Sequence, residues 1–98
     1  MQLSERMAAV ADMVTPGCRL ADVGCDHGYL SVWLCGKKIA RRAVALDVSR
    51  GPLRSAARSV AAAGLEAYIE TRLSDGLAAV APGEVDSVVI AGMGGRLM

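Results

Sequence analysis

Four short apolar segments, each followed by a polar or glycine-containing turn, most strongly limit what this chain can fold into. These segments are residues 18–23, 43–47, 67–73 and 85–90. Helical patterns separate the first three, and such short connections between parallel strands imply right-handed crossovers. The sequence therefore predicts an α/β fold, with a partial parallel sheet of about four strands in the order 3-2-1-4 and flanking helices.

Helix signals fill the intervals between these segments. Ser4 can cap an amphipathic helix that ends at Pro16-Gly17, because apolar residues recur there at spacings of three and four. Two further helices are expected over residues 29–36 and 51–63. A single helical turn is expected around residues 77–80, ahead of the fourth strand.

The composition supports one packed domain. The chain has 98 residues, of which 53% are hydrophobic, and its net charge is only +1. Disordered chains are more polar and more highly charged, and about two thirds of the unfolded surface of such a chain could be buried. Because Phe is absent, the core must consist mainly of aliphatic side chains, which suits helices packed on a buried parallel sheet.

Neither a membrane span nor a metal site is expected. No apolar stretch approaches the roughly 18 residues of a span, and the first residues lack a signal-peptide pattern, so we expect a cytoplasmic protein. Cys18, Cys25 and Cys35 lack the spacing of zinc or redox motifs and are interpreted as buried, reduced thiols. His27 is the only imidazole, which leaves few ligands for a metal ion.

The turn after the first predicted strand indicates the ligand. In a parallel α/β sheet, ligands bind beyond the carboxyl ends of the strands, where Gly24 and Gly28 allow a ligand close to main-chain N–H groups. A dinucleotide site would have a glycine where this chain has Asp26, whose carboxylate would repel a pyrophosphate. The ammonium and sulfonium groups of S-adenosylmethionine suit this carboxylate, so that cofactor is favoured over NAD.

Acidic residues also follow the next two predicted strands. Asp47 stands about twenty residues after Gly24, where an acidic side chain can accept hydrogen bonds from both ribose hydroxyls of an adenosine. Asp75-Gly76 stands where a side chain could reach the adenine amine. Simpler explanations exist, because Asp-Gly is a common turn and Asp26 could cap the following helix.

Four motifs lie at these strand ends. They span residues 22–30 (D-x-G-x-D-H-x-Y-L), 47 with 51–53, 73–77, and 90–97, which contains A-G-M-G-G-R. Together they resemble the bacterial tRNA (adenine(22)-N1)-methyltransferase family, and the similarity covers essentially all 98 residues. The resemblance implies a Rossmann-like class I methyltransferase domain that uses S-adenosylmethionine to methylate N1 of a tRNA adenine. Such enzymes continue with further strands and a helical region, so residues 1–98 are expected to be an N-terminal part that is inactive on tRNA alone.

The resemblance also implies roles for individual residues. Gly24, Asp26, His27 and Gly28 would line the methionine part of the cofactor, Asp47 its ribose, and Asp75 with Gly76 its adenine. Asp22 is also counted among the cofactor-binding residues.

A glycine-rich loop would form the floor of the pocket for the target base, through Gly92, Met93, Gly94 and Gly95. Met93 would pack against the base or, alternatively, fill the core at the edge of the sheet. No general base is assigned, because adenine N1 carries its own lone pair and catalysis would rest on positioning and desolvation.

Basic residues are concentrated between positions 37 and 58. Seven basic residues accompany a single acidic one there, and Arg50, Arg54 and Arg58 recur at every fourth position. This stripe suits contact with tRNA phosphates, or it is simply a solvated helix face. Two other functions stay open at this point, namely half of an NAD-type oxidoreductase and an inactive adenosyl-binding fragment.

Overall fold

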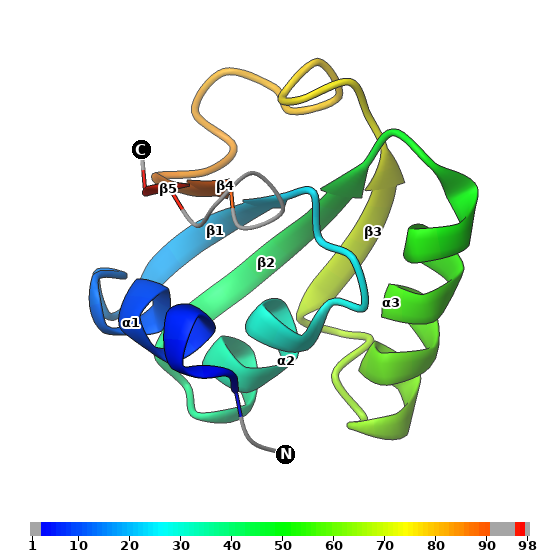
Figure 1. Ribbon diagram of the computed structural model, residues 1–98. Coiled ribbons are helices and arrows are strands. Elements are labelled where there is room, and N and C mark those ends of the chain that lie inside the picture. The colour runs from blue at the N-terminus through cyan, green and yellow to red at the C-terminus, as the bar shows by residue number, and fades with distance from the viewer. Residues whose placement is uncertain (1–2, 91–95, 98) are drawn as a thin grey trace.

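A sheet with helices on one face organises the computed structural model, which describes residues 3–90 and 96–97 (Figure 1). Its strand order is β3-β2-β1-β4-β5. The strands are β1 (Cys18–Val23), β2 (Ala40–Asp47), β3 (Ile69–Leu73), β4 (Ser87–Ile90) and β5 (Arg96–Leu97). Strands β1 to β4 are parallel, which confirms the predicted order and the Rossmann-like α/β class. The antiparallel strand β5 was not predicted.

Two strand boundaries differ from the prediction for local reasons. Strand β2 begins at Ala40, three residues early, because the exposed Arg41 and Arg42 interrupt the apolar pattern, although Ala40 and Arg42 pair with β1 on either side of an irregularity at Arg41. Strand β3 begins at Ile69 because the N–H groups of Tyr68 and Ile69 both donate to the Leu65 carbonyl, at 2.9 and 3.0 Å, and close a turn.

The segment between β3 and β4 also departs from the prediction. Residues 77–80 form hydrogen-bonded turns instead of a helical turn, with Ala78 N donating to Asp75 O and Val80 N donating to Leu77 O. Strand β4 begins at Ser87 and not at Val85.

The three helices are α1 (Glu5–Asp12), α2 (Tyr29–Gly36) and α3 (Arg50–Ala62). Ser4 caps α1 as predicted, since its Oγ accepts a hydrogen bond from Met7 N at 3.2 Å. Helix α2 has Gly28 as its N-cap, in the left-handed conformation and without a side-chain cap. Asp26 therefore does not cap this helix, and that explanation of its presence is wrong.

The core has two layers, one on each face of the sheet. Between the sheet and the helices lie fully buried side chains such as Leu20, Leu30 and Leu34. All three cysteines belong to this layer and are buried and free, as the sequence predicted. On the other face, residues of β1 and β2 such as Val23 and Leu46 pack against residues of the segment 74–86. No helix within residues 3–90 and 96–97 is long and apolar enough to cross a membrane.

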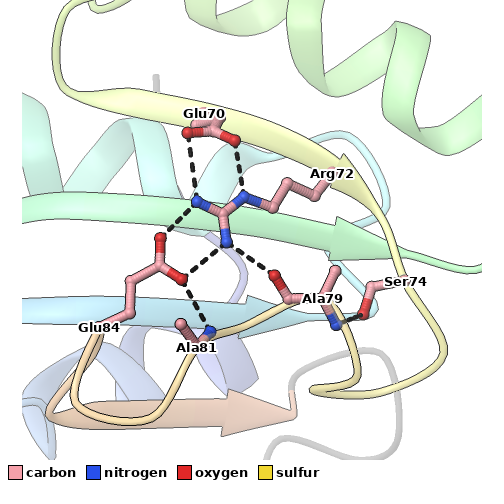
Figure 2. Close-up of polar contacts among 6 residues, drawn as sticks. All are labelled: Glu70, Arg72, Ser74, Ala79, Ala81 and Glu84. Atoms are coloured by element: carbon pink, nitrogen blue, oxygen red, sulfur yellow. Dashed lines mark hydrogen bonds and ion pairs between the residues drawn. The ribbon is translucent and has the colours of Figure 1, made fainter.

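A polar network centred on Arg72 connects the segment 74–86 to β3 (Figure 2). Arg72 Nε donates to Glu70 at 2.6 Å, and Nη1 donates to Glu84 and to the carbonyl of Ala79, each at 2.8 Å. Nη2 is shared by Glu70 and Glu84. Glu84 in turn accepts a hydrogen bond from Ala81 N at 3.0 Å. The side chains of Arg72 and Glu84 are 21% and 30% exposed, so this ion pair is partly shielded from water, whereas Glu70 is 57% exposed.

Candidate functional site

The turns after β1, β2 and β3 lie side by side at the carboxyl edge of the sheet. The carbonyl of Leu46 accepts hydrogen bonds from Gly24 N at 2.8 Å and from Cys25 N at 3.0 Å, which joins the first turn to β2. Ser74 N donates to the carbonyl of Asp47 at 2.8 Å, which joins the third turn to β2. Parallel pairing of the three strands therefore brings the predicted site residues of these turns to one edge.

Asp22 is the most unusual polar residue of the site. It lies in β1 and is 1% exposed. Its Oδ2 accepts a hydrogen bond from Ser31 Oγ of α2 at 2.8 Å, whereas Oδ1 has no partner among the described residues. Burial raises the pKa of Asp22 to about 6, and the nearby charge of Asp47 acts in the same direction. At neutral pH the site thus contains a buried carboxylate with one unpaired oxygen, which favours a ligand that donates hydrogen bonds or brings positive charge.

The turn from Gly24 to Gly28 has an unusual backbone. Gly24, Asp26 and Gly28 all have positive φ, at 69°, 54° and 73°. A Cβ added to Gly28 would lie 2.9 Å from the Cβ of Ala56, so glycine is required there for the close approach of α3. This packing role is additional to the ligand approach predicted from the sequence.

His27 is attached to α3 by its ring. Nδ1 lies 2.5 Å from Ser55 Oγ, and the ring stacks on Tyr29 with a centroid distance of 5.2 Å. The other nitrogen, Nε2, lies 3.8 Å from Asp26 Oδ1, and both side chains are more than half exposed. His27 therefore positions the exposed turn, while the carboxylate of Asp26 stays accessible to a ligand.

The second and third turns are held by their own polar side chains. Oδ1 of Asp47 accepts a hydrogen bond from Ser49 N at 3.0 Å. The buried Ser74 hydroxyl donates to the carbonyl of Gly76 at 2.8 Å and accepts from Ala79 N at 3.1 Å. Asp75 is exposed beside them. These hydrogen bonds fix the backbone of the two turns and therefore the positions from which the Asp47 and Asp75 side chains extend.

Burial and nearby carboxylates also change the pKa of the Cys25 thiol, which lies at the same edge of the sheet. Burial raises the pKa of Cys25 to about 12, and the charges of Asp22 and Asp47 contribute in the same direction. A thiol with so high a pKa is protonated at neutral pH and is a poor nucleophile. Cys25 is therefore a packing residue of the turn, in agreement with the prediction of a buried, reduced cysteine.

The structure brings together the site residues predicted for the first three turns. The predicted loop of Gly92, Met93, Gly94 and Gly95 lies outside the described residues. Sequence reasoning missed Ser31 and Ser55, which orient Asp22 and His27. The available signal was a serine on an otherwise apolar helix, since Ser31 stands between Leu30 and Val32. Among residues 3–90 and 96–97, no group of three or more His, Cys, Asp or Glu side chains could hold a metal ion.

Comparison with known proteins shows which family the chain matches. Residues 3–98 match the family described as methyltransferase domain. A curated relative, tRNA (adenine(22)-N(1))-methyltransferase of Bacillus subtilis strain 168, is 40% identical over 98 residues. The match covers 100% of this chain and 41% of the relative, so the chain spans about two fifths of that protein's length. The resemblance read from the four motifs is thereby confirmed.

Two solved structures also share the fold. A Streptococcus pneumoniae protein in complex with S-adenosyl-L-methionine has a TM-score of 0.88 and 40% identity, covering 93% of this chain and 43% of that one. The TrmK protein of M. capricolum, in complex with S-adenosyl-homocysteine, has a TM-score of 0.76 and 36% identity, covering 79% of this chain and 34% of that one.

Proposed function

Because the chain belongs to the methyltransferase domain family, we propose that it forms the S-adenosylmethionine-binding part of a tRNA adenine-N1 methyltransferase. The name of the Bacillus subtilis relative supports the reaction and the tRNA substrate. The ligands of the two similar structures support the cofactor. Since the chain spans 41% of that relative, the activity and the substrate are proposed for the protein as a whole. A tRNA substrate also favours a cytoplasmic location.

The observation that carries the proposal is the buried Oδ1 of Asp22, which has no hydrogen-bond partner in the described part of the chain. The amino acid end of S-adenosylmethionine bears an ammonium group, which can donate a charge-assisted hydrogen bond to a carboxylate. Asp22 is buried at the carboxyl edge, beside the turn from Gly24 to Gly28, so the residues present fit this cofactor. The exposed carboxylate of Asp26 would add to the attraction for positive charge and would oppose the pyrophosphate of NAD.

Asp47 would hold the adenosine. Its carboxylate leaves β2 at the same edge, and its backbone is joined to the turn that contains Asp75 and Gly76. Two adjacent ribose hydroxyls can donate to one carboxylate, and the Asp75 turn would then lie toward the adenine. We propose Gly92, Met93, Gly94 and Gly95 as the floor of the pocket for the target base.

The bound cofactor supplies a methyl group activated by its attachment to a sulfonium. Because adenine N1 carries its own lone pair, it could form the bond to the methyl carbon as the carbon–sulfur bond breaks and S-adenosylhomocysteine leaves, so the chain would need no general base for this step. The residues of the carboxyl edge would bind and orient the reactants and exclude water, which are the main sources of rate enhancement in such a transfer.

Ligand-dependent stabilisation tests the cofactor assignment. We expect S-adenosylhomocysteine to raise the melting temperature of the chain and NAD at the same concentration to leave it unchanged, because only a ligand of the folded state stabilises it. Stabilisation by NAD alone would refute the proposal. For the reaction itself, the transfer of tritium from labelled S-adenosylmethionine to N1 of adenine in unmodified tRNA would be measured with the whole protein.

The Asp47→Ala variant tests the ribose contact. We expect it to weaken S-adenosylhomocysteine binding by about 1.5–3 kcal/mol, the contribution of charge-assisted hydrogen bonds, in isothermal titration calorimetry. Asp12→Ala is the matched control, since Asp12 is an exposed carboxylate at the end of α1. Unchanged affinity in a folded Asp47→Ala variant would remove Asp47 from the site.

A further inference from the structure

Helix α3 presents three arginines to solvent. Arg50, Arg54 and Arg58 are all exposed and follow one another at every fourth residue, so they share one face of the helix. The helix contains no acidic residue, and no acidic side chain of the described residues lies within ion-pair distance of these three. This arginine face therefore carries positive charge that the described part of the chain does not neutralise.

The position of these charges opposes the stability of the helix. Like charges four residues apart on a helix repel each other, as Arg50 and Arg54 do, and again Arg54 and Arg58. Arg50 also begins the helix, where the helix dipole is positive and an acidic side chain would be favourable. The N-cap residue Ser49 provides no side-chain hydrogen bond to offset this. An arrangement unfavourable for the isolated helix is favourable once an anion binds to it.

A shallow groove of about 250 Å³ runs beside this face, between α3 and the edge strand β3. Its lining residues are Arg50, Leu53, Arg54, Ala57, Thr71 and Leu73. Two cations thus border a mainly apolar surface, and Leu73 is 48% exposed. Leu73 directly precedes the turn of Ser74 and Asp75, so the groove adjoins the part of the site proposed for adenine.

The remaining basic residues of positions 37–58 lie elsewhere. Lys37, Lys38, Arg41 and Arg42 join the end of α2 to the start of β2, where Ala40 pairs with the first residue of β1. They therefore occupy the amino edge of the sheet, opposite the site. Figure 1 shows α3 beginning near the carboxyl ends of β2 and β3, on the site's side of the molecule.

We propose that the arginine face of α3, with the groove beside β3, binds the sugar–phosphate backbone of the tRNA substrate. Arginine suits phosphate recognition, and the apolar groove suits a ribose or an unstacked base. The inference rests on the proposed function and extends it by naming the surface on which the RNA lies. The repulsion among the three arginines is relieved when phosphates bind, so the same residues lower fold stability and raise RNA affinity.

Two matched variants test this surface. One carries Arg50→Gln, Arg54→Gln and Arg58→Gln, and the other carries Lys37→Gln, Lys38→Gln and Arg41→Gln, so each loses three positive charges. Binding of labelled unmodified tRNA is measured by fluorescence anisotropy at several salt concentrations. Melting temperature and calorimetry with S-adenosylhomocysteine are measured on the same samples, which separates the RNA surface from the cofactor site.

We expect the α3 variant to lose about tenfold or more in tRNA affinity, with the slope of log affinity against log salt reduced by about two. Its melting temperature should rise by a few degrees, and its affinity for S-adenosylhomocysteine should stay within about twofold. The amino-edge variant should lose no more than about threefold in tRNA affinity.

Equal losses in the two variants, or an unchanged salt slope, would overturn the proposal. So would displacement of tRNA by polyglutamate at matched charge, because the surface would then suit acidic proteins equally well. A parent chain that binds S-adenosylhomocysteine but not tRNA would refute the RNA surface and leave the cofactor assignment intact. A parent chain that binds neither ligand would contradict the proposed function, and the inference with it.

Discussion

The two faces of the sheet carry polar clusters of opposite character. On the outer face, the guanidinium of Arg72 is surrounded by two carboxylates and a carbonyl, and Glu84 also accepts a backbone N–H (Figure 2). On the helix face, Asp22 is almost completely buried, yet one of its oxygens has no partner among the described residues. The first cluster is complete within the described residues, whereas the second leaves one carboxylate oxygen without a donor among them.

This difference separates a structural role from a binding role. Complete polar networks stabilise one arrangement of the backbone, here the passage of residues 74–86 across the sheet. A buried carboxylate with an unpaired oxygen lowers the free energy of unfolding until a donor arrives. The pKa values follow the same division: hydrogen bonds from Arg72 lower the pKa of Glu84 to about 2, whereas burial raises that of Asp22 to about 6.

The strongest test of the structural cluster is Arg72→Met, which keeps an unbranched side chain but removes every donor. We expect the free energy of unfolding, measured by urea denaturation, to fall by about 3 kcal/mol, because two carboxylates and a carbonyl lose their partner. The affinity of the folded protein for S-adenosylhomocysteine should change less than twofold, since the cluster lies on the other face.

Glu70→Gln is the control for this variant. The Glu70 side chain is 57% exposed, so the free energy of unfolding should change by no more than about 0.5 kcal/mol. A tenfold loss of cofactor affinity in folded Arg72→Met would show that the two faces are coupled. It would contradict the separation of a structural cluster from a binding cluster.

The next largest effect is expected for Asp22→Asn. An amide removes the buried charge and keeps an oxygen that can accept from Ser31. The free energy of unfolding at pH 7 should therefore rise by about 2 kcal/mol, because a carboxyl whose folded pKa is raised to about 6 destabilises the fold once it ionises. The affinity for S-adenosylhomocysteine should fall tenfold or more, because the amide oxygen accepts from Ser31 and an NH2 group, which only donates, replaces the oxygen that would accept from the ammonium. If both quantities fell in calorimetry and denaturation, Asp22 would be a structural residue.

The smallest effect is the pH dependence of cofactor binding. The pKa of Asp22 is about 6 in the folded chain and 3.8 ordinarily, so stability from this group is fully present below pH 3.8 and is lost as pH rises through 6. Binding of an ammonium group has the opposite sign, because it requires the ionised carboxylate. We expect the affinity for S-adenosylhomocysteine to fall about tenfold, or 1.4 kcal/mol, between pH 7 and pH 5. The Asp22→Asn variant should lack this dependence, and a parallel decline in that variant would assign it to another group.

The sequence predicted the features that depend on local patterns. The cap by Ser4, the extent of β1 and the four-strand order follow from residue periodicity and turn residues, and the structure confirms them. The start of β2 was predicted three residues too late, because Arg41 and Arg42 are charged and break the apolar pattern. Both residues nevertheless belong to the strand.

Contacts between distant residues could not be predicted in this way. Ser55 reaches His27 across 28 positions, and Ala56 approaches Gly28 only because α3 packs against the start of α2. The motif around Gly28 indicated a ligand turn, but the neighbour that requires glycine is determined by tertiary packing. The unpaired oxygen of Asp22 could not be predicted for the same reason, because it depends on the burial of β1 beneath α2.

The contact between Gly28 and Ala56 constrains how this protein can vary. An added methyl group at position 28 would lie within 2.9 Å of the Ala56 Cβ, so a larger residue at either position forces the helix and the turn apart. Ala56 lies on the same helix as the three arginines, between Arg54 and Arg58. Helix α3 and the glycine turn are therefore in close contact, and we expect a substitution that shifts the helix to displace the turn as well. We therefore expect position 56 to accept only small residues, as position 28 does, although Ala56 has no chemical role of its own.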